Sequence, residues 1–513
     1  MNLFSRLFVP LLAAFGAVSA AEKPSWKAPK AVILFYADDL GYGDIGANGA
    51  KSIPTPNVDK LAREGLRFTD AHSTSSVCTP SRFGLLTGKY PWRQHGTGIL
   101  PGDAAMIVPT ADKAMTLASM MQAAGYRTAA IGKWHLGLGD GSGPIDWNGP
   151  ISPGPKEVGF DESYIMAATA DRVPCVFIRN GAVDKLDPAD PIVVSYKENF
   201  PGMPTGKNNP ELLRVKAVPG KGHDNTIING IGRIGFMKGG RSALWTDTDL
   251  ADTLTDEAVR FIAANRDNRF FLYFATNDIH VPRDPHARFI GKSQCGVRGD
   301  VTVQMDDCLG RIMKALKENG LDRDTLVIFT SDNGPVVNDG YLDGSEKDLG
   351  AHRPAGPWRG GKYTIHEGGT RMPMITWWPG SIKPGVSPAL VSHVDFVASL
   401  ARLVGVRIPA GSAPDSTDQL AALLGRDAKG RSELVEHKMD NKHLALRRGS
   451  YKYIPNQCLN AARGEMRASR AGSGVLIDLK ADPGETTDIS AKKPRVAEEM
   501  RKALQRCIDA AVK

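Results

Sequence analysis

Cysteine is scarce in this chain of 513 residues. It occurs six times, at Cys78, Cys175, Cys295, Cys308, Cys458 and Cys507. Small secreted folds that depend on disulfides have a much higher cysteine density, so that class is excluded. Aromatic residues are also sparse, at 7%, and the Lys and Arg residues behind the net charge of +8 are scattered along the sequence. Without a basic helix or a stacking motif, binding to nucleic acid is not expected.

Long hydrophobic runs are absent after the N-terminus, where none approaches the ~20 residues needed to span a bilayer. Residues 1–20 fit a secretory signal peptide, with Arg6 as the positive start, an apolar stretch from Leu7, and Val18-Ser19-Ala20 as the cleavage site. Position 21 is not cysteine, and no Asn-x-Ser/Thr acceptor for glycosylation occurs. We therefore expect a periplasmic or secreted bacterial protein without a membrane anchor.

What the chain does contain is an alternating pattern of strands and helices. Hydrophobic residues make up 42% of it, enough for a large core. Through the first four hundred residues, apolar runs of strand length alternate with amphipathic helical stretches, which predicts an α/β fold: a doubly wound, mostly parallel sheet flanked by helices. The predicted strands are residues 31–36, 128–131, 270–275 and 325–330, and the predicted helices are residues 56–63, 116–124 and 393–404.

The pattern predicts two structural units after the signal peptide. Residues 21–425 form the larger, and within it residues 139–244 are rich in Gly, Pro and Asn with little periodicity. We expect this insertion to rise above the sheet and to carry specificity. Residues 426–513 form a smaller C-terminal α+β subdomain with a short antiparallel sheet, including strands near 445–453 and 474–479, and a final helix over residues 495–511.

Polar residues follow four of the predicted strands. They are Asp38-Asp39, Lys133 with His135, His280, and Asp332-Asn333. Ligands of open α/β sheets gather beyond the carboxyl ends of the strands, so we expect these side chains to converge. Each also has an ordinary explanation when taken alone: a turn for the aspartates, a solvated strand end for Lys133 and His135, and a core position for His280.

Taken together, Asp38, Asp39, Asp332 and Asn333 offer three carboxylates and an amide oxygen. An all-oxygen set suits Ca²⁺ better than zinc, which prefers His and Cys. Three carboxylates held together would also repel one another unless a cation neutralised them. The sequence therefore predicts a calcium site.

Cationic and histidine side chains are expected around that site. Lys133 and Lys362 would balance the charge of a tetrahedral oxyanion, and His135 and His280 could exchange protons near neutral pH. Lys362 follows Arg359-Gly360-Gly361, which could also be only a flexible turn.

Cys78 has two ordinary interpretations. It could be a small buried residue, or a cysteine at a helix N-terminus with Thr79 as the cap and Pro80 at the first helical position. The second placement lowers a thiol pKa and leaves a cysteine hydrolase open. A thiolate beside three carboxylates would be poorly placed, and a neutral nucleophile that binds the cation through oxygen fits better.

Two stretches resemble the signatures of the sulfatase family, the formylglycine-dependent branch of the alkaline phosphatase superfamily. Cys78-Thr79-Pro80-Ser81-Arg82, with residues 86–88, resembles the first signature, and residues 125–135, which include Lys133 and His135, resemble the second. Residues 38–39, 331–334, 361–362 and 367–371 also resemble family elements, in the expected order. The resemblance covers most of residues 31–404.

The resemblance implies that Cys78 becomes formylglycine, made by a formylglycine-generating enzyme or an anaerobic sulfatase-maturing enzyme. The hydrated aldehyde would bind one Ca²⁺ together with Asp38, Asp39, Asp332 and Asn333. The resemblance also implies that Arg82 steadies the diol and that Asp332 deprotonates its attacking hydroxyl. Lys133 and Lys362 would neutralise the sulfuryl oxygens, and His280 would protonate the leaving alcohol. His135 would then deprotonate the second hydroxyl, so that sulfate is expelled.

One departure concerns the acid for the leaving group. Family members commonly have a His-x-Pro-His-like element after the third strand, where this chain has Ile279-His280-Val281-Pro282-Arg283-Asp284-Pro285-His286. His280 matches best, and His286 is its rival.

The implied substrate is a sulfated carbohydrate. The chain resembles bacterial carbohydrate sulfatases that desulfate host or marine glycans, closest to those acting on 6-sulfated galactose or N-acetylgalactosamine. Asp171-Arg172 and His223-Asp224 in the insertion could bind sugar hydroxyls, with a structural ion pair as the alternative.

Two other functions stay open. A phosphodiesterase or phosphonate hydrolase of the same superfamily would be distinguished by matched sulfate and phosphate esters. An inactive protein that binds sulfated glycans would result if Cys78 were never modified.

Overall fold

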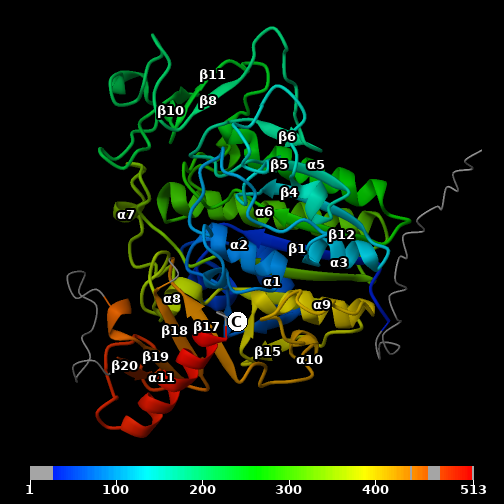
Figure 1. Cartoon of the computed structure of the whole chain (residues 1–513), viewed down its shortest axis with the longest axis vertical. Helices are drawn as coiled ribbons and strands as arrows, with labels where there is room; N and C mark the ends of the chain where they lie inside the picture. The colour runs from blue at the N-terminus through cyan, green and yellow to red at the C-terminus, as the bar shows by residue number, and fades with distance from the viewer. Residues whose placement is uncertain (1–26, 440–441, 460–473, 511–513) are drawn as a thin grey trace, which may run out of the picture.

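The computed structural model describes residues 27–439, 442–459 and 474–510. The expected signal peptide, residues 1–20, lies outside these ranges. A large sheet crosses the middle of the molecule, and a second, smaller sheet lies below it (Figure 1). Within the described ranges, no helix is long and apolar enough to cross a membrane.

The large sheet has ten strands, with β1 (Ala31–Ala37) near its centre. β1 runs parallel to β13 (Thr325–Ser331) on one side and to β12 (Phe270–Ala275) on the other. Every residue of these three strands is buried, as expected for central parallel strands covered on both faces. The full order is β15 (Gly385–Ser387), β2 (Leu66–Phe68), β14 (Met374–Trp377), β13, β1, β12, β4 (Arg127–Lys133), β5 (Glu162–Met166), β6 (Phe177–Arg179) and β7 (Ala182–Val183).

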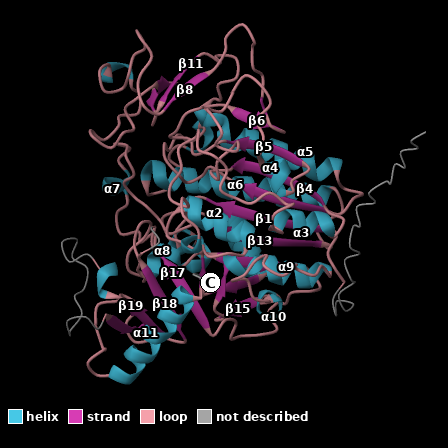
Figure 2. Ribbon diagram, in the orientation of Figure 1, coloured by secondary structure: helices cyan, strands magenta, loops and turns pink. Residues whose placement is uncertain are grey.

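Helices cover both faces of this sheet, which confirms the predicted α/β fold. On one face, α1 (Pro56–Glu64) and α5 (Leu250–Ala264) both contact α6 (Gly296–Glu318). On the other face, α2 (Cys78–Thr87), α3 (Leu117–Ala123) and α9 (Phe396–Val404) contact one another, in front of the sheet in Figure 2. Thr116 caps α3 by accepting a hydrogen bond from the Ser119 N–H.

The expectation for the insertion was partly wrong. β5 lies within residues 139–244, yet it is a parallel strand of the large sheet, and β6 and β7 extend the sheet from it. These strands are short, and β5 and β6 mix polar with apolar residues, so they lack the apolar run of a central strand. The insertion also contains two small antiparallel pairs, β8 (Val193–Ser195) with β11 (Phe236–Lys238) and β9 (Ile227–Ile228) with β10 (Ile231–Gly232).

The C-terminal part forms the predicted antiparallel sheet, with strands β17 (Glu433–His437), β18 (Leu444–Arg448), β19 (Tyr451–Ile454) and β20 (Val475–Asp478). The single strand predicted near residues 445–453 is a hairpin, because Gly449, at a φ of 56°, turns the chain between β18 and β19. Helix α11 (Pro494–Asp509) packs on β18 and β19.

Shorter elements complete the fold. They are β3 (Ala71–His72), α4 (Pro155–Val158), α7 (Ser345–Asp348), α8 (Glu367–Thr370), β16 (Val391–Ser392) and α10 (Leu420–Leu423). All six cysteines are described, and none is in a disulfide.

Candidate active site

The carboxyl ends of β1 and β13 bring the predicted oxygen ligands together. Ala37 pairs with Ser331 in the parallel register, so Asp38-Asp39 and Asp332-Asn333 leave the sheet side by side. All four side chains are buried. Asp39 has a φ of 60°, unusual for a residue other than glycine, and its N–H donates to Asp332 Oδ1 at 3.1 Å. This turn therefore holds the two strand ends in contact.

Two buried oxygens of this set are left without a hydrogen-bond partner. Asp38 Oδ1 and Asn333 Oδ1 accept no hydrogen bond from the described residues. Asn333 Nδ2 donates to Asp39 Oδ1 at 2.7 Å, which orients the amide so that its oxygen remains available. Unsatisfied buried oxygens are costly, and a bound hard cation would satisfy them. The set therefore fits Ca²⁺.

Three basic side chains surround the carboxylates. Lys133 Nζ donates to Asp38 Oδ2 at 2.6 Å, and Lys362 Nζ donates to Asp39 Oδ2 at 3.0 Å. Arg82 binds Asp332 Oδ2 through Nε at 3.1 Å and Nη2 at 2.8 Å. Each carboxylate thus has one basic partner.

Burial acts differently on the neighbouring aspartates. It raises the pKa of Asp38 well above its usual value, and the charge of Asp332 adds to this effect against Lys133. Burial also acts to raise the pKa of Asp39, but Lys362 and Lys133 outweigh it and the pKa is lowered. An anionic Asp38 would therefore need a further positive charge beside it.

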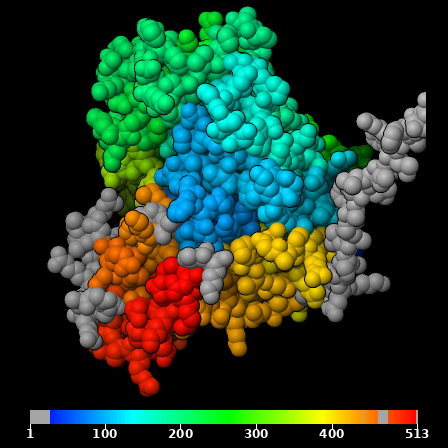
Figure 3. All heavy atoms as spheres, in the orientation of Figure 1, coloured from blue at the N-terminus to red at the C-terminus, as the bar shows by residue number. Residues whose placement is uncertain are grey.

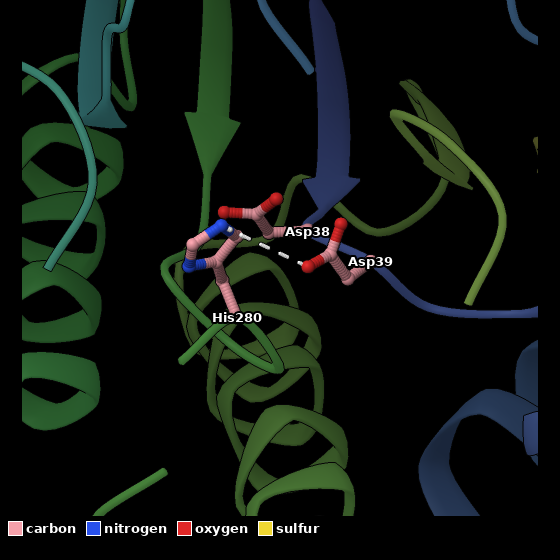
Figure 4. A group of neighbouring side chains, drawn as sticks. All are labelled: Asp38, Asp39 and His280. Atoms are coloured by element: carbon pink, nitrogen blue, oxygen red, sulfur yellow. Dashed lines mark ion pairs between the residues drawn. The ribbon is translucent and has the colours of Figure 1, made fainter. Parts of the chain in front are cut away.

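Figure 4 shows His280 beside Asp38 and Asp39, with its Nε2 atom 3.8 Å from Asp39 Oδ2. His280 Nδ1 lies 2.7 Å from the carbonyl oxygen of Val281, so it donates there and Nε2 faces the site. Burial lowers the pKa of His280 well below its usual value, and Lys362 adds to the effect. His286, the rival from the sequence, accepts the Arg288 N–H at the start of a short helical turn and is not part of this group.

Cys78 is the first residue of α2, and its side chain is buried beside His135. The distance from Cys78 Sγ to His135 Nδ1 is 3.3 Å. His135 Nε2 lies 2.9 Å from the Leu100 carbonyl oxygen, to which it donates, so Nδ1 is the atom able to accept a proton from position 78. His135 has a φ of 54°, and its pKa is lowered well below the usual value by burial and then by Lys133.

The thiol itself is not activated. Burial raises the pKa of Cys78, although Lys133 and Lys362 act to lower it. The expected cap was also wrong: Val77 is the N-cap residue and Pro80 stands third in the helix. A protonated thiol is a poor nucleophile, so the raised pKa of Cys78 argues against a cysteine hydrolase.

The insertion contributes a group of three partners. Arg172 Nη1 donates to Asp171 Oδ1 at 2.7 Å, and His223 Nε2 lies 3.1 Å from Asp171 Oδ2. The Arg172 charge also contributes to lowering the pKa of His135, after burial and Lys133, which places this group near the site. Asp224 instead accepts the Lys207 N–H through its carbonyl oxygen.

Three further residues at the site were not predicted. Asp339 accepts from Lys362 Nζ at 2.9 Å and lies 3.3 Å from the hydroxyl of Tyr363. Tyr273 accepts from Arg82 Nη1 at 3.2 Å through its hydroxyl oxygen. Asp339 lies in a polar loop that no motif marks, and Tyr273 lies inside an apolar strand, so neither had a signal in the sequence.

The fold and this arrangement of oxygen ligands, lysines and histidines define a hydrolase of anionic esters. A family model named Sulfatase matches residues 30–406. An N-acetylgalactosamine-6-O-sulfatase from Bacteroides thetaiotaomicron is 48% identical over 92% of this chain and 92% of its own length, and human arylsulfatase A is 31% identical over 98% and 91%. The chain belongs to the sulfatase family, and it is a sulfuric ester hydrolase.

Solved structures agree with this assignment. A Bacteroides thetaiotaomicron structure from work on the metabolism of multiple glycosaminoglycans has a TM-score of 0.89 and 46% identity, covering 95% of this chain and all of that one. A sulfatase from Pseudoalteromonas sp. has a TM-score of 0.68 and 27% identity, covering 94% and 90%.

Proposed function

We propose that the enzyme removes 6-sulfate groups from N-acetylgalactosamine or galactose in sulfated glycans. The similarity to the bacterial N-acetylgalactosamine-6-O-sulfatase, which extends over 92% of both chains, is the observation that carries the substrate proposal. The contact between Cys78 and His135 beside the carboxylates supports the chemistry.

The nucleophile we propose is formylglycine made from Cys78 by a maturation enzyme. Asp38, Asp39, Asp332 and Asn333 would hold Ca²⁺ together with the modified residue. The two unpartnered buried oxygens, Asp38 Oδ1 and Asn333 Oδ1, support this ligand set among the described residues. When bound, the cation and the hydrated aldehyde supply a Lewis acid and an oxygen nucleophile.

The side chains around this centre have complementary tasks. Lys133 and Lys362 would stabilise the negative charge of the sulfuryl oxygens, and Arg82 would hold Asp332 in the orientation needed to accept a proton. In its doubly protonated form, His280 would deliver the Nε2 proton to the departing sugar oxygen. His135 would accept a proton at Nδ1 from residue 78 so that sulfate can leave.

Substrate recognition is assigned to Asp171, Arg172 and His223. Their mutual contacts fix the Asp171 carboxylate, and a held carboxylate and guanidinium suit neighbouring sugar hydroxyls. The ion pair is compatible with sugar binding, because only Nη1 of Arg172 donates to Asp171 and the other N–H groups of the guanidinium can donate to a sugar hydroxyl.

The proposal extends to organisation and location. Residues 21–425 would form the catalytic domain, with residues 139–244 serving recognition, and residues 426–513 the C-terminal subdomain. A signal peptide over residues 1–20 would direct the enzyme to the periplasm or the exterior of a bacterium.

The test is free-sulfate release from a panel of singly sulfated sugars. We expect turnover of 6-sulfated N-acetylgalactosamine and galactose to exceed that of their 3- and 4-sulfated isomers by at least tenfold. Matched phosphate esters should be poor substrates. Equal turnover of the isomers, or faster hydrolysis of the phosphates, would contradict the proposal.

A further inference from the structure

The segment that leads to Cys78 is bonded to the C-terminal sheet. The Ser76 N–H donates to the carbonyl oxygen of His437, the last residue of β17, at 2.9 Å. The hydroxyls of Ser75 and Ser76 both donate to the Lys438 carbonyl oxygen, at 3.0 and 2.6 Å. The end of β17 therefore fixes the chain two residues before Cys78.

The same serine reaches the segment that carries Lys362. The carbonyl oxygen of Ser76 accepts the Tyr363 N–H at 3.0 Å. Cys78 and Lys362 are thus linked through one backbone unit, which is itself held by the C-terminal sheet. A shift of β17 would move both side chains together.

Glu485, from the loop after β20, holds both ends of the Lys362 segment. Its carbonyl oxygen accepts from Arg359 Nη1 at 2.8 Å, and its Oε2 accepts the Glu367 N–H at 2.7 Å. The Gly368 N–H donates to the Arg359 carbonyl oxygen at 2.7 Å, which closes the segment into a loop. The position of Lys362 within this loop therefore depends on Glu485.

Lys452 of β19 forms ion pairs with both Glu485 and Glu367. Its Nζ atom lies 2.6 Å from Glu436 Oε2, 3.2 Å from Glu367 Oε1 and 3.3 Å from Glu485 Oε1. The side chains of all four residues are fully buried. A buried ammonium with three carboxylates cannot be removed without leaving uncompensated charge.

The neighbouring carboxylates do not form a second metal site. Asp70, His72 and Glu367 lie close enough to hold an ion. However, Arg371 and Arg447 already bind Glu367 Oε2 at 2.6 and 2.8 Å and also pair with Asp70. These guanidinium groups occupy the positions that a cation would need.

We propose that the C-terminal sheet positions the catalytic centre, with Lys452 and Glu485 as the positioning residues that set where Cys78 and Lys362 lie. The inference rests on the proposed roles of Cys78 and Lys362. In Figure 3 the orange and red C-terminal residues form a lobe below the blue N-terminal segment, in agreement with these contacts. Displacement of a catalytic group by ~1 Å costs on the order of a hundredfold in rate.

The experiment compares Lys452→Met and Glu485→Ala with wild-type enzyme, using an aryl sulfate and 6-sulfated N-acetylgalactosamine. Rates are measured well below the melting temperature, so that the enzyme is folded. Each rate is then divided by the fraction of enzyme that contains formylglycine, which mass spectrometry of the Cys78 peptide provides. Both variants should lose at least tenfold in kcat with KM within twofold. Leu504→Ala is the control, since Leu504 is a buried residue of α11 that packs in the same subdomain, and it should lower the melting temperature with kcat unchanged.

A purely structural role predicts a lower melting temperature but an unchanged corrected kcat for both variants, and that result would overturn the inference. If neither variant folds, Ser76→Ala, which removes only the hydroxyl bond to Lys438, should lower kcat at least threefold, and an unchanged kcat refutes the inference. Wild-type activity on the aryl sulfate without activity on the sugar would reject the substrate proposal alone. A wild-type enzyme that is inactive on every sulfate ester would reject the catalytic roles on which the inference depends.

Discussion

The Sγ atom of Cys78 lies 3.3 Å from Nδ1 of His135, and the opposite ring nitrogen of His135 is bonded to the Leu100 carbonyl oxygen. This arrangement fixes which nitrogen faces position 78. Since that nitrogen carries a lone pair in the neutral ring, the group at position 78 has a proton acceptor directly beside it.

Cys78→Ala should abolish sulfate release while the protein remains folded, because the variant has no precursor of the formylglycine nucleophile. Sulfate release and the melting temperature are the measurements. Cys308→Ala is a suitable control, since Cys308 is also buried but lies in α6, with its thiol against the Ala251 carbonyl oxygen. Activity above a thousandth of wild type in Cys78→Ala would mean that another residue is the nucleophile.

Asn333→Ala should weaken binding of Ca²⁺ by at least tenfold, because it removes one of the two unpartnered buried oxygens of the site. The affinity is measured by calcium titration and by the rise in melting temperature that calcium produces in chelator-treated enzyme. Asn338→Ala is the matched control, because Asn338 is exposed and bonds Glu346. Equal calcium affinity in the two variants would remove Asn333 from the ligand set.

His280→Gln should slow hydrolysis of sugar sulfates by roughly 10²–10⁴-fold, the usual contribution of a general acid. An aryl sulfate with an acidic phenol needs little protonation of its leaving group, so its rate should fall much less. The ratio of the two rates is the measurement. His286→Gln should leave both rates within twofold of wild type, and the reverse outcome would assign the acid to His286.

Arg172→Ala should raise KM for 6-sulfated sugars by at least tenfold and leave aryl sulfate hydrolysis nearly unchanged, since the phenol has no sugar hydroxyls to bind. Steady-state kinetics on both substrates measure this difference. Arg241→Ala serves as the control, because Arg241 is exposed and pairs with Asp190 at the surface of the insertion. Equal losses on the two substrates would point to a catalytic rather than a recognition role.

His393 should make stability depend on pH. Burial lowers its pKa from 6.5 to about 3, where it bridges the hydroxyls of Tyr36 and Thr330 in the neutral form. As pH falls below 6.5, His393 is protonated in the unfolded chain but stays neutral in the folded protein. The stabilising contribution of neutral His393 is therefore fully present above pH 6.5 and decreases below it. The loss reaches about 2 kcal/mol at pH 5.

The measurement is urea unfolding between pH 7.5 and pH 5 for wild type and His393→Gln. The variant should be less stable at pH 7.5, and the difference between the two proteins should shrink by about 2 kcal/mol at pH 5. His95→Gln, at an exposed position, should follow wild type at both values. A constant difference between wild type and His393→Gln would contradict the lowered pKa.

Much of the fold could be predicted from the sequence because central parallel strands are continuous apolar runs. The strand expected at residues 270–275 is β12 as it stands in the structure, and the helix expected at residues 56–63 is α1 with one further residue. The strands of the insertion were missed because short strands near the edge of the sheet, such as β6, lack that signal. The turn at Gly449 was missed because the polar and apolar residues on either side of it resemble one strand.

For the candidate site, the sequence indicated which polar side chains follow the ends of predicted strands. The pairing of those strands in the sheet explains why the side chains meet. Asp38 and Asp332 are 294 positions apart in sequence, yet the parallel register of β1 and β13 places them in one cluster. Asp339 and Glu485 have no such marker, because only tertiary packing brings them to their partners Lys362 and Glu367.

The sequence by itself determined the family, and it indicated the residues that we propose as oxygen ligands and as the modified cysteine, because these depend on residue identity and local order. Only the tertiary structure decided which nitrogen of His135 faces Cys78, that His280 rather than His286 reaches the aspartates, and that the C-terminal sheet is bonded to both catalytic segments. Contacts of this kind depend on angles and distances between elements far apart in the chain, and local residue patterns do not encode them.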